Sequence, residues 1–152
     1  KNGPQAIGIS RGGRNTKIHL VAADACTPLI FSLSPGQAAD APEGRSLLER
    51  QGHAIPSEAH HMIMDRAYEG DAMRQSVRDR GLEPVVPPKK NRLKPWEYNK
   101  MLYKRRNEVE RAFCRIKRFR RVFTRYDKLD LMYLAFVIFA FSADMLLCVN
   151  RP

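Results

Sequence analysis

The stretch "YKRRNEVERAFCRIKRFRR", residues 103–121, carries the features of the sequence that decide its fold and its function. It reads as the larger part of one helix that we expect from about Tyr98 to Arg121. Arginine and lysine dominate it, as in a simple nucleic-acid-binding patch, yet Glu108 and Glu110 lie inside it. The question that this stretch raises is what role an acid at position 110 has among so many cations.

One face of this expected helix collects four side chains of different chemistry: Tyr103, Arg106, Glu110 and Lys117. At about 100° per residue, these positions fall within roughly 60° of arc. An exposed face with an ordinary Arg106–Glu110 pair explains the same stripe, because charges four residues apart on a helix commonly pair. Beside the stripe lies an apolar strip that we expect to pack on the core: Phe113, Ile116 and Phe119.

The positive charge of the chain is confined to one segment. From Lys89 to Lys128 there are 16 basic and 4 acidic residues, so this segment accounts for the whole net charge of +11. A basic stripe on an otherwise balanced chain is typical of a protein that binds a polyanion. A generally solvated surface would explain the total charge, but not its confinement.

Length and cysteine content set the broad class. With 152 residues and 43% hydrophobic content, the chain predicts a single domain over 1–152. Cys26, Cys114 and Cys148 are odd in number and widely spaced, which argues against a disulfide framework or a zinc site and favours a cytoplasmic setting. No signal-peptide pattern opens the chain, and it begins at Lys1 rather than Met, so we expect part of a longer product.

The most apolar stretch is "LMYLAFVIFAFSADMLLCV", residues 131–149. Its uninterrupted apolar run ends at Ser142, and Asp144 follows, whereas a membrane-spanning helix needs about 20 apolar residues. The pattern favours a buried core helix and no membrane partner, with a membrane anchor as the alternative.

The remaining elements suggest alternating strands and helices. The expected order is β-β-α-β-α-β-α-α, which is typical of an α/β or α+β layered domain. The elements before the long helix are strands over 16–24 and 27–34 in an antiparallel hairpin, a helix from Asp40 to about Gln51, a strand over 61–65, a helix over 70–81 and a strand over 83–88.

Asp65 closes the expected strand "HMIMD". Ligands bind at strand ends in open α/β sheets, so this position suits a functional carboxylate. Asp is also common as the cap of a turn, and position alone fits both interpretations equally.

Phosphodiester cleavage by two metal ions gives a reason for acids among cations. Such a reaction needs several carboxylates to hold Mg²⁺ ions, while nearby cations hold the DNA phosphates. An acid on a basic helix suits that division of roles.

At this point the sequence resembles a known family. Tyr103, Arg106, Glu110 and Lys117 match the Y-x2-R-x3-E-x6-K signature of bacterial insertion-sequence transposases of the DDE type. "MDRAYEGD" resembles the segment with the second catalytic aspartate of that family. "GISRGGRNTKIHLVAAD" and "RFRRVFTRYDKLDLMYLAFVIFAF" also resemble family segments, so the likeness covers nearly the whole chain.

The resemblance implies an α/β, RNase H-like mixed sheet flanked by helices, and DNA strand cleavage and transfer with two Mg²⁺ or Mn²⁺ ions. It makes Asp65 the second and Glu110 the third catalytic and metal-binding acid.

The resemblance also implies double-stranded DNA at inverted-repeat ends and target sites as partner, a homo-oligomer on that DNA and a nucleoid-associated location in a bacterial cytoplasm. The residues expected to contact DNA are Tyr103, Arg106, Lys117, Arg120 and Arg121. By the same likeness Gln37 and Asp40 are candidates to line the site, although a helix cap also explains Asp40.

The chain departs from the family at its start. The family's first aspartate lies on a first strand, upstream of the segment matched by "GISRGGRNTKIH", and nothing before Ile7 can be that strand. Asp24 falls elsewhere in the pattern. We therefore expect the two-ion site only when an upstream part of the same transposase supplies this acid, and no cutting by the chain alone.

Two other interpretations stay open at the sequence level. One is an RNase H-like nuclease without preference for transposon ends, and the other is a non-catalytic DNA-binding or regulatory remnant of a transposase. Trp96 in the basic loop can stack on a base or plug a hydrophobic gap, and we favour the plug.

Overall fold

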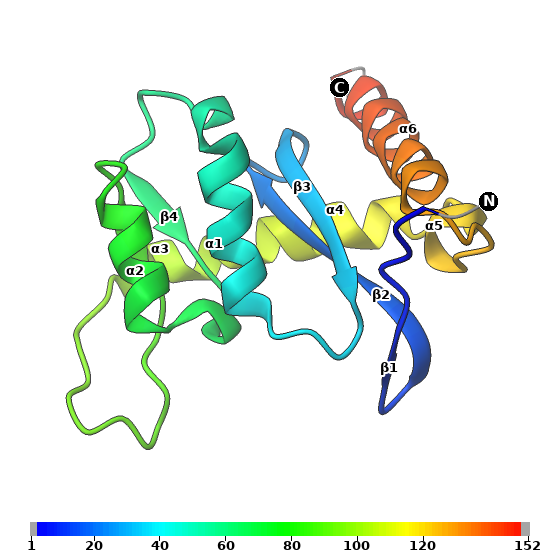
Figure 1. The fold of residues 1–152 in the computed structure, drawn as a ribbon. Helices are drawn as coiled ribbons and strands as arrows, with labels where there is room; N and C mark the ends of the chain where they lie inside the picture. The colour runs from blue at the N-terminus through cyan, green and yellow to red at the C-terminus, as the bar shows by residue number, and fades with distance from the viewer. Residues whose placement is uncertain (1–2, 150–152) are drawn as a thin grey trace. The chain divides into compact units, whose positions relative to one another are not determined.

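The computed structural model describes residues 3–149, and the chain forms two compact units (Figure 1). The terminal unit combines Lys1–Ala38 with Val109–Pro152, and the central unit is Ala39–Glu108. The boundary between them falls inside helix α4 (Asn107–Ile116).

The terminal unit contains the predicted hairpin. Strands β2 (Gly13–Ala22) and β3 (Pro28–Pro35) pair antiparallel, with Thr16 opposite Pro35. Asp24 shapes the turn, because its Oδ1 accepts hydrogen bonds from the N–H groups of Cys26 at 2.7 Å and Thr27 at 2.9 Å. The prediction of an antiparallel pair here is confirmed.

A short strand that we did not predict precedes this hairpin. Strand β1 (Gly8–Ser10) pairs antiparallel with Gly13–Asn15, so it covers only the beginning of β2. The tight turn between them depends on Gly13, whose φ of 94° lies in the region that favours glycine.

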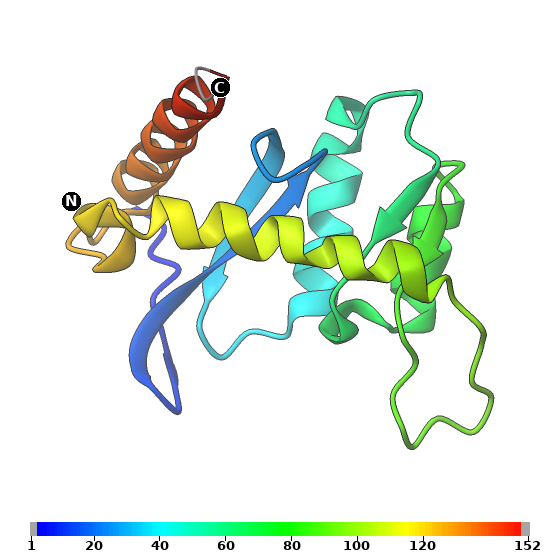
Figure 2. The ribbon, with the colours of Figure 1, turned by 180° about the vertical axis from the view of Figure 1, so that it is seen from behind.

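Helices α4, α5 (Arg120–Phe123) and α6 (Asp130–Val149) complete the terminal unit. Figure 2 shows α4 crossing the strands of the β2–β3 hairpin. Alternate residues of the strands pack against the helices, as a period of two requires. The buried cluster consists of Ala112, Ile116, Val122, Tyr133, Val137, Ala140 and Phe141, and partly buried apolar side chains packed on it include Ile18, Leu20, Phe31, Leu33, Phe113, Phe119 and Phe136.

The single long helix expected from Tyr98 to Arg121 is wrong. The segment divides into α3 (Lys100–Tyr103), a 3₁₀ turn η3 (Lys104–Arg106), α4 and α5. After Ile116 the chain tightens, with the Phe119 N–H donating to the Ile116 carbonyl at 3.0 Å. Because Phe119 and Val122 both pack on the terminal core, burial of these side chains competes with straight helical propagation. The apolar strip of Phe113, Ile116 and Phe119 is confirmed.

Helix α6 packs through one side only, so the expectation of a buried helix is half correct. The buried side presents Tyr133, Val137, Phe141 and Asp144, while Leu131 on the other side is 76% exposed. By length and composition alone, Asp130–Cys148 would be long and apolar enough to cross a membrane, and 28% of that stretch is buried.

An ion pair ties α6 to α4 within the terminal unit. The Arg115 Nε donates to both carboxylate oxygens of Asp144, at 2.9 and 2.7 Å, and the guanidinium also donates to the Ala25 carbonyl oxygen. Both charged side chains are nearly inaccessible, with 12% of Arg115 and 7% of Asp144 exposed. This pair joins two helices and the turn of the hairpin at one point.

The central unit is a small α/β layer (Figure 1). It contains α1 (Asp40–Gln51), η1 (Gly52–Ala54), β4 (His61–Ile63), η2 (Arg66–Tyr68), α2 (Asp71–Arg78) and β5 (Glu83–Val85), followed by α3 and η3. Strands β4 and β5 pair in parallel, with Met62 opposite Pro84, and α2 forms the crossover between them. Gly81, with φ of 73°, ends the α2 region as predicted.

The core of the central unit is aliphatic and rich in methionine. Its buried side chains are Leu47, Leu48, Met62, Met64, Met73, Val77, Leu82, Val85 and Val86. The mixed α/β class is thus as predicted, with one antiparallel sheet of three strands and one parallel pair among the described residues 3–149.

Replacing Asp144 should test the ion pair. Asp144→Asn leaves the Arg115 guanidinium buried without its counter-charge, so we expect a loss of about 3 kcal/mol in the free energy of unfolding. Glu108→Gln is the matched control, because the Arg105–Glu108 pair is exposed, with 57% of Arg105 accessible, and should cost less than about 1 kcal/mol. Denaturant unfolding measures the free energy of unfolding of both variants. Equal losses would show that the Arg115–Asp144 pair stabilises the fold no more than an exposed pair does.

Candidate active site

Asp65 lies just past the carboxyl end of β4. Pairing with β5 continues through Met64, whose N–H donates to the Val85 carbonyl at 3.0 Å. Asp65 then caps η2, since its Oδ1 accepts from the Arg66 N–H at 2.7 Å. The capping interpretation is confirmed, but the cap uses only Oδ1, and 58% of the side chain stays accessible. The strand end therefore presents a fixed, exposed carboxylate.

Two residues of the predicted signature lie beside Asp65 within the central unit. The Arg106 Nη1 is 3.6 Å from the Asp65 Oδ2. The Arg106 guanidinium carbon is also 5.9 Å from the centre of the Tyr103 ring. The 3₁₀ turn explains this contact, because side chains three residues apart eclipse each other in such a turn. Tyr103, Arg106 and Asp65 are thus brought together.

Neighbouring groups shift the pKa of the Tyr103 phenol. Burial raises the pKa of its phenol, the charge of Arg106 lowers it, and the charge of Asp65 raises it. The ring is held edge-on against Tyr98, with ring centres 5.5 Å apart. Tyr103 therefore remains a neutral hydrogen-bonding group near the Asp65 carboxylate at physiological pH.

A second tyrosine near Asp65 was not singled out from the sequence. Burial raises the pKa of Tyr68 far above its usual value, and the charges of Asp40, Asp65 and Glu43 raise it further. The Tyr68 ring packs over Gly44 so closely that a Cβ there would lie 2.8 Å from the ring carbon Cε1. The glycine of "APEGR" was the only signal in the sequence for this close approach.

Asp40 and Gln37, the two candidates to line the site, belong to different units. Asp40 and Glu43 stand in the first turn of α1, and both act electrostatically on the Tyr68 hydroxyl, as Asp65 does. Gln37 belongs to the terminal unit, where a Cβ on Gly8 would meet its side chain at 1.6 Å. Of these two candidates, Asp40 belongs to the unit that contains Asp65, and Gln37 belongs to the other unit.

Glu110 belongs to the terminal unit and lies on the outward side of α4. Ala112 and Ile116 on the opposite side are buried, which leaves Glu110 exposed. Lys117 is exposed one residue beyond the end of α4, and its N–H still donates to the Phe113 carbonyl at 3.1 Å. Glu110 and Lys117 therefore share the exposed side of this helix.

The two arginines predicted to contact DNA have partners within the terminal unit. Arg120 donates to the Tyr126 hydroxyl at 3.1 Å. Arg121 is 3.5 Å from Asp127 and lies over the Phe136 ring at 4.1 Å, yet 54% of its side chain is accessible. Both guanidinium groups are therefore positioned by these contacts while remaining at the surface.

Glu108, the other acid of the opening stretch, has a simpler role. Its carboxylate accepts a hydrogen bond from the Arg105 Nε at 2.9 Å, three residues earlier on the chain. This local pair belongs to the central unit and explains Glu108 without any ligand.

The basic loop before α3 is anchored through Trp96. The indole N–H donates to the Val86 carbonyl at 2.9 Å, and the guanidinium carbons of Arg74 and Arg92 lie 3.5 and 4.7 Å from the ring centre. Arg92 also reaches the buried Glu69 at 3.1 Å. Trp96 is thus held within its own unit, partly buried between two arginines rather than in a hydrophobic gap.

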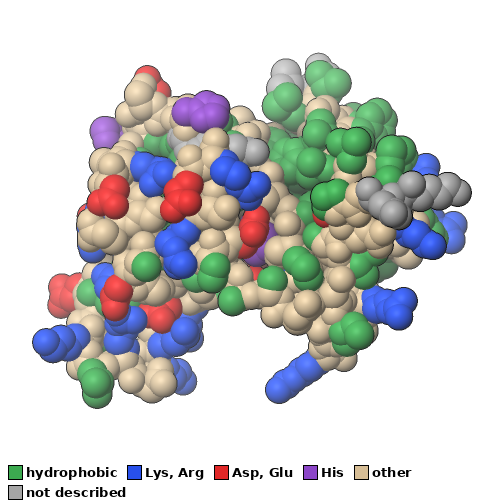
Figure 3. Space-filling view, in the orientation of Figure 1, with side chains coloured by type: hydrophobic (Ala, Val, Ile, Leu, Met, Phe, Trp, Pro, Cys, Tyr) green, Lys and Arg blue, Asp and Glu red, His purple; other side chains and the backbone are tan. Residues whose placement is uncertain are grey.

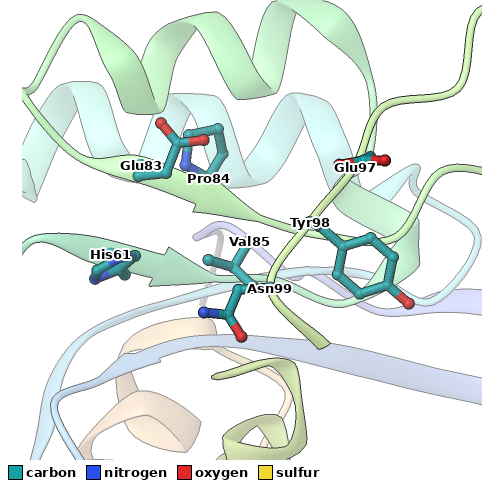
Figure 4. A pocket seen from close by; sticks show the side chains of 7 residues that line it. All are labelled: His61, Glu83, Pro84, Val85, Glu97, Tyr98 and Asn99. Carbon is teal, nitrogen blue, oxygen red and sulfur yellow. The ribbon is translucent and has the colours of Figure 1, made fainter. Parts of the chain in front are cut away.

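A hollow in the central unit lies away from Asp65, which is not among the residues that line it. It has a volume of about 270 Å³ and is lined by His61, Glu83, Pro84, Val85, Glu97, Tyr98 and Asn99 (Figure 4). Asn99 is engaged there as the cap of α3, since its Oδ1 accepts from the Met101 and Leu102 N–H groups at 3.0 Å. We therefore do not assign the expected chemistry to this hollow.

Within residues 3–149, no group of three or more His, Cys, Asp or Glu side chains is placed to hold a metal ion. Asp65 and Glu110 are each exposed oxygen donors in their own unit. The chain thus presents carboxylates of the right chemistry for Mg²⁺, but no assembled three-ligand set in the part of the chain that is described. Cys26, Cys114 and Cys148 are free thiols.

Comparison with known proteins gives one consistent result. The family described as "Transposase DDE domain" matches residues 5–143. The putative transposase for insertion sequence element IS6501 of Brucella ovis is 29% identical over 125 residues, which is 80% of this chain and 91% of that protein. The putative transposase for insertion sequence element IS402 of Burkholderia cepacia is 28% identical over 135 residues, which is 84% of this chain and 60% of that protein. No solved structure matches.

The buried Tyr68 phenol predicts a dependence of stability on pH. Its pKa is raised in the folded state, so the unfolded chain loses this proton first, from about pH 10, and stability falls as pH rises beyond that point. Tyr68→Phe should make the fall shallower by up to about 1.4 kcal/mol per pH unit. Urea unfolding between pH 9 and 11 measures the slope, with the exposed Tyr126→Phe as control; a slope unchanged in Tyr68→Phe would refute the burial of this phenol.

Proposed function

Because this chain belongs to the transposase DDE family, we propose that it forms the catalytic portion of an insertion-sequence transposase, which cuts DNA at the ends of the element and joins them to a target. DNA transposition is the general function of its relatives. The observation that carries the proposal is the exposed Asp65 carboxylate at the end of β4, with Arg106 of the Y-R-E-K signature beside it at 3.6 Å.

We propose Asp65 and Glu110 as two carboxylate ligands for divalent ions, Mg²⁺ or Mn²⁺. Both are exposed oxygen donors, which is the ligand type that these ions prefer. Two such ions, held by these carboxylates, would supply activation of a water or a 3′-hydroxyl and stabilisation of the leaving oxygen. In this proposal Arg106 orients the Asp65 carboxylate through the ion pair at 3.6 Å, and Tyr103 supports Arg106 through its ring.

The first of the three acids is expected from a strand upstream of the chain. Strand β1 pairs only with Gly13–Asn15, so among the described strands β3 alone pairs with β2 from Thr16 to Ala22. A strand with an aspartate added there would extend the sheet toward the RNase H-like arrangement. In this proposal 1–152 is one catalytic domain, incomplete at its N-terminal side, and the upstream part of the transposase is a required partner.

The cations are assigned to DNA. Lys117 is exposed on the same side of α4 as Glu110, and Arg120 and Arg121 follow it at the surface. The segment from Lys89 to Lys128 concentrates the net charge of the chain, which suits double-stranded DNA at inverted-repeat ends and at the target. A homo-oligomer assembled on DNA, in a nucleoid-associated location, completes the proposal.

A non-catalytic DNA-binding or regulatory remnant is the second candidate function. The observation that favours it is the lack of a three-ligand group among residues 3–149. Both candidates predict DNA binding, and only the first predicts metal-dependent cutting when the upstream part is present. A nuclease of related fold would cut random duplexes and element ends equally at matched salt.

Removal of the proposed third acid should separate cutting from binding. In the transposase completed with its upstream part, Glu110→Ala should reduce Mg²⁺-dependent cleavage of labelled element ends to background, while DNA affinity stays within about threefold, because a ligand to the ions is lost but no phosphate contact is. Glu108→Ala, on the same segment and with the same charge, is the control that should keep activity. Unchanged cleavage by Glu110→Ala would remove this residue from the site.

Lys117 should contribute a phosphate contact. Lys117→Ala is expected to weaken binding similarly across DNA sequences and to lower the slope of log affinity against log salt by about 1. Fluorescence anisotropy over a range of salt concentrations measures this slope, and Lys117→Arg should restore it. A slope identical to that of the unmodified chain would show that Lys117 does not touch phosphate.

A further inference from the structure

Helix α6 exposes an apolar face that neither the metal site nor DNA binding explains. Between 39% and 76% of each large side chain on this face is accessible. Hydrophobic side chains gather over this helix in the space-filling view (Figure 3). The residues are Leu131, Met132, Ile138, Phe139, Met145 and Leu146.

The spacing of these residues is regular. Leu131, Ile138 and Met145 repeat every seven residues, and so do Met132, Phe139 and Leu146. The exposed small residues Ala135 and Ser142 lie between these two lines. Two apolar lines at a spacing of seven form the ridges that another helix packs against, and the small residues between them leave room for its side chains.

Charge is directed away from this face. From Leu131 to Leu147 the one charged residue is Asp144, and it turns inward to Arg115. The net charge of +11 is concentrated between Lys89 and Lys128, so contact between two copies through that segment would be opposed by repulsion. The α6 face is therefore a surface where two copies can meet without opposing charges.

The size of the face suits a dimer. With roughly 150–200 Å² for a large apolar side chain, the exposed fractions of these six residues amount to about 500–670 Å². This exceeds the few hundred Å² that a monomer commonly exposes, and it approaches the roughly 800 Å² that each partner buries in a standard interface.

The other side of α6 holds the helix in the terminal unit, which disfavours a bilayer as the occupant. The Tyr133 hydroxyl donates to the Val122 carbonyl at 2.9 Å. Asp130 at the start of the helix accepts from the Ala6 N–H at 2.7 Å and from Arg125 at 2.8 Å. Insertion of α6 into a membrane would break these bonds and the Arg115–Asp144 pair.

We propose that a second copy of this chain docks on the exposed face of α6, with α6 packed against α6 of the partner. The contact is isologous, so the same residues meet across a two-fold axis and the assembly closes as a dimer. It needs neither DNA nor metal, and so it stands or fails independently of the proposed catalytic function.

Sedimentation velocity of the chain without DNA tests the dimer. In the micromolar range the chain should sediment as one species of twice 17.4 kDa. Ala135→Glu places a charge at the centre of the face without removing packing, because Ala135 is exposed. Two like charges apposed in an apolar contact cost several kcal/mol, so the dimer dissociation constant should rise about a hundredfold or more.

The control is Leu93→Glu, which introduces the same charge at a leucine that is 98% exposed in the central unit and should leave the dimer intact. Circular dichroism verifies that each variant is folded, and Ser142→Glu replaces Ala135→Glu if the latter is not. A monomeric unmodified chain, a dimer insensitive to both substitutions on α6, a broad series of aggregates, or cosedimentation with phosphatidylcholine vesicles in place of dimerisation would each overturn the proposal.

Discussion

The inward packing of Ala112 and Ile116 decides which side chains of α4 face solvent, and the expected chemistry depends on that choice. Both residues are buried in the core of the terminal unit, so Glu110 and Lys117 are exposed on the opposite side. The Arg115–Asp144 pair strengthens the same packing, because it joins α4 to α6 at nearly inaccessible positions. The few apolar residues of α4 thus fix the orientation of a mostly charged helix. That orientation places Glu110 at the surface among the cations.

The same constraint accounts for the division of roles along residues 103–121. Glu108 is used locally by Arg105, whereas Arg106 reaches the Asp65 carboxylate with Tyr103 at its side. Mg²⁺ requires oxygen ligands and DNA requires cations, and a helix that presents both can serve both partners. The apolar face of α6 has a role separate from DNA binding, since it lacks the charged side chains that contact with DNA needs.

Much of this arrangement could be predicted from the sequence, and the failures have physical causes. The hairpin, α1, the β4–α2–β5 unit and the capping position of Asp65 followed from local patterns of turns and periodicity. The breaks around α4 did not, because burial of Phe119 and Val122 overrides helical propagation. The packing of Tyr68 over Gly44 depends on a contact distant in sequence, which no local pattern encodes. That α6 buries only one of its sides could not be predicted from its sequence, because apolar residues occur all round the helix and tertiary packing decides which of them are buried.

The central claim is that Asp65 and Glu110 are two acids of a cutting site that requires a third from outside the chain. The most direct measurement is Mg²⁺-dependent nicking of element-end DNA by this chain alone, compared with the same chain extended by its upstream coding segment. The account predicts no nicking by the chain alone and end-specific nicking by the extended protein. Robust nicking by the chain alone, lost in Glu110→Ala, would contradict it.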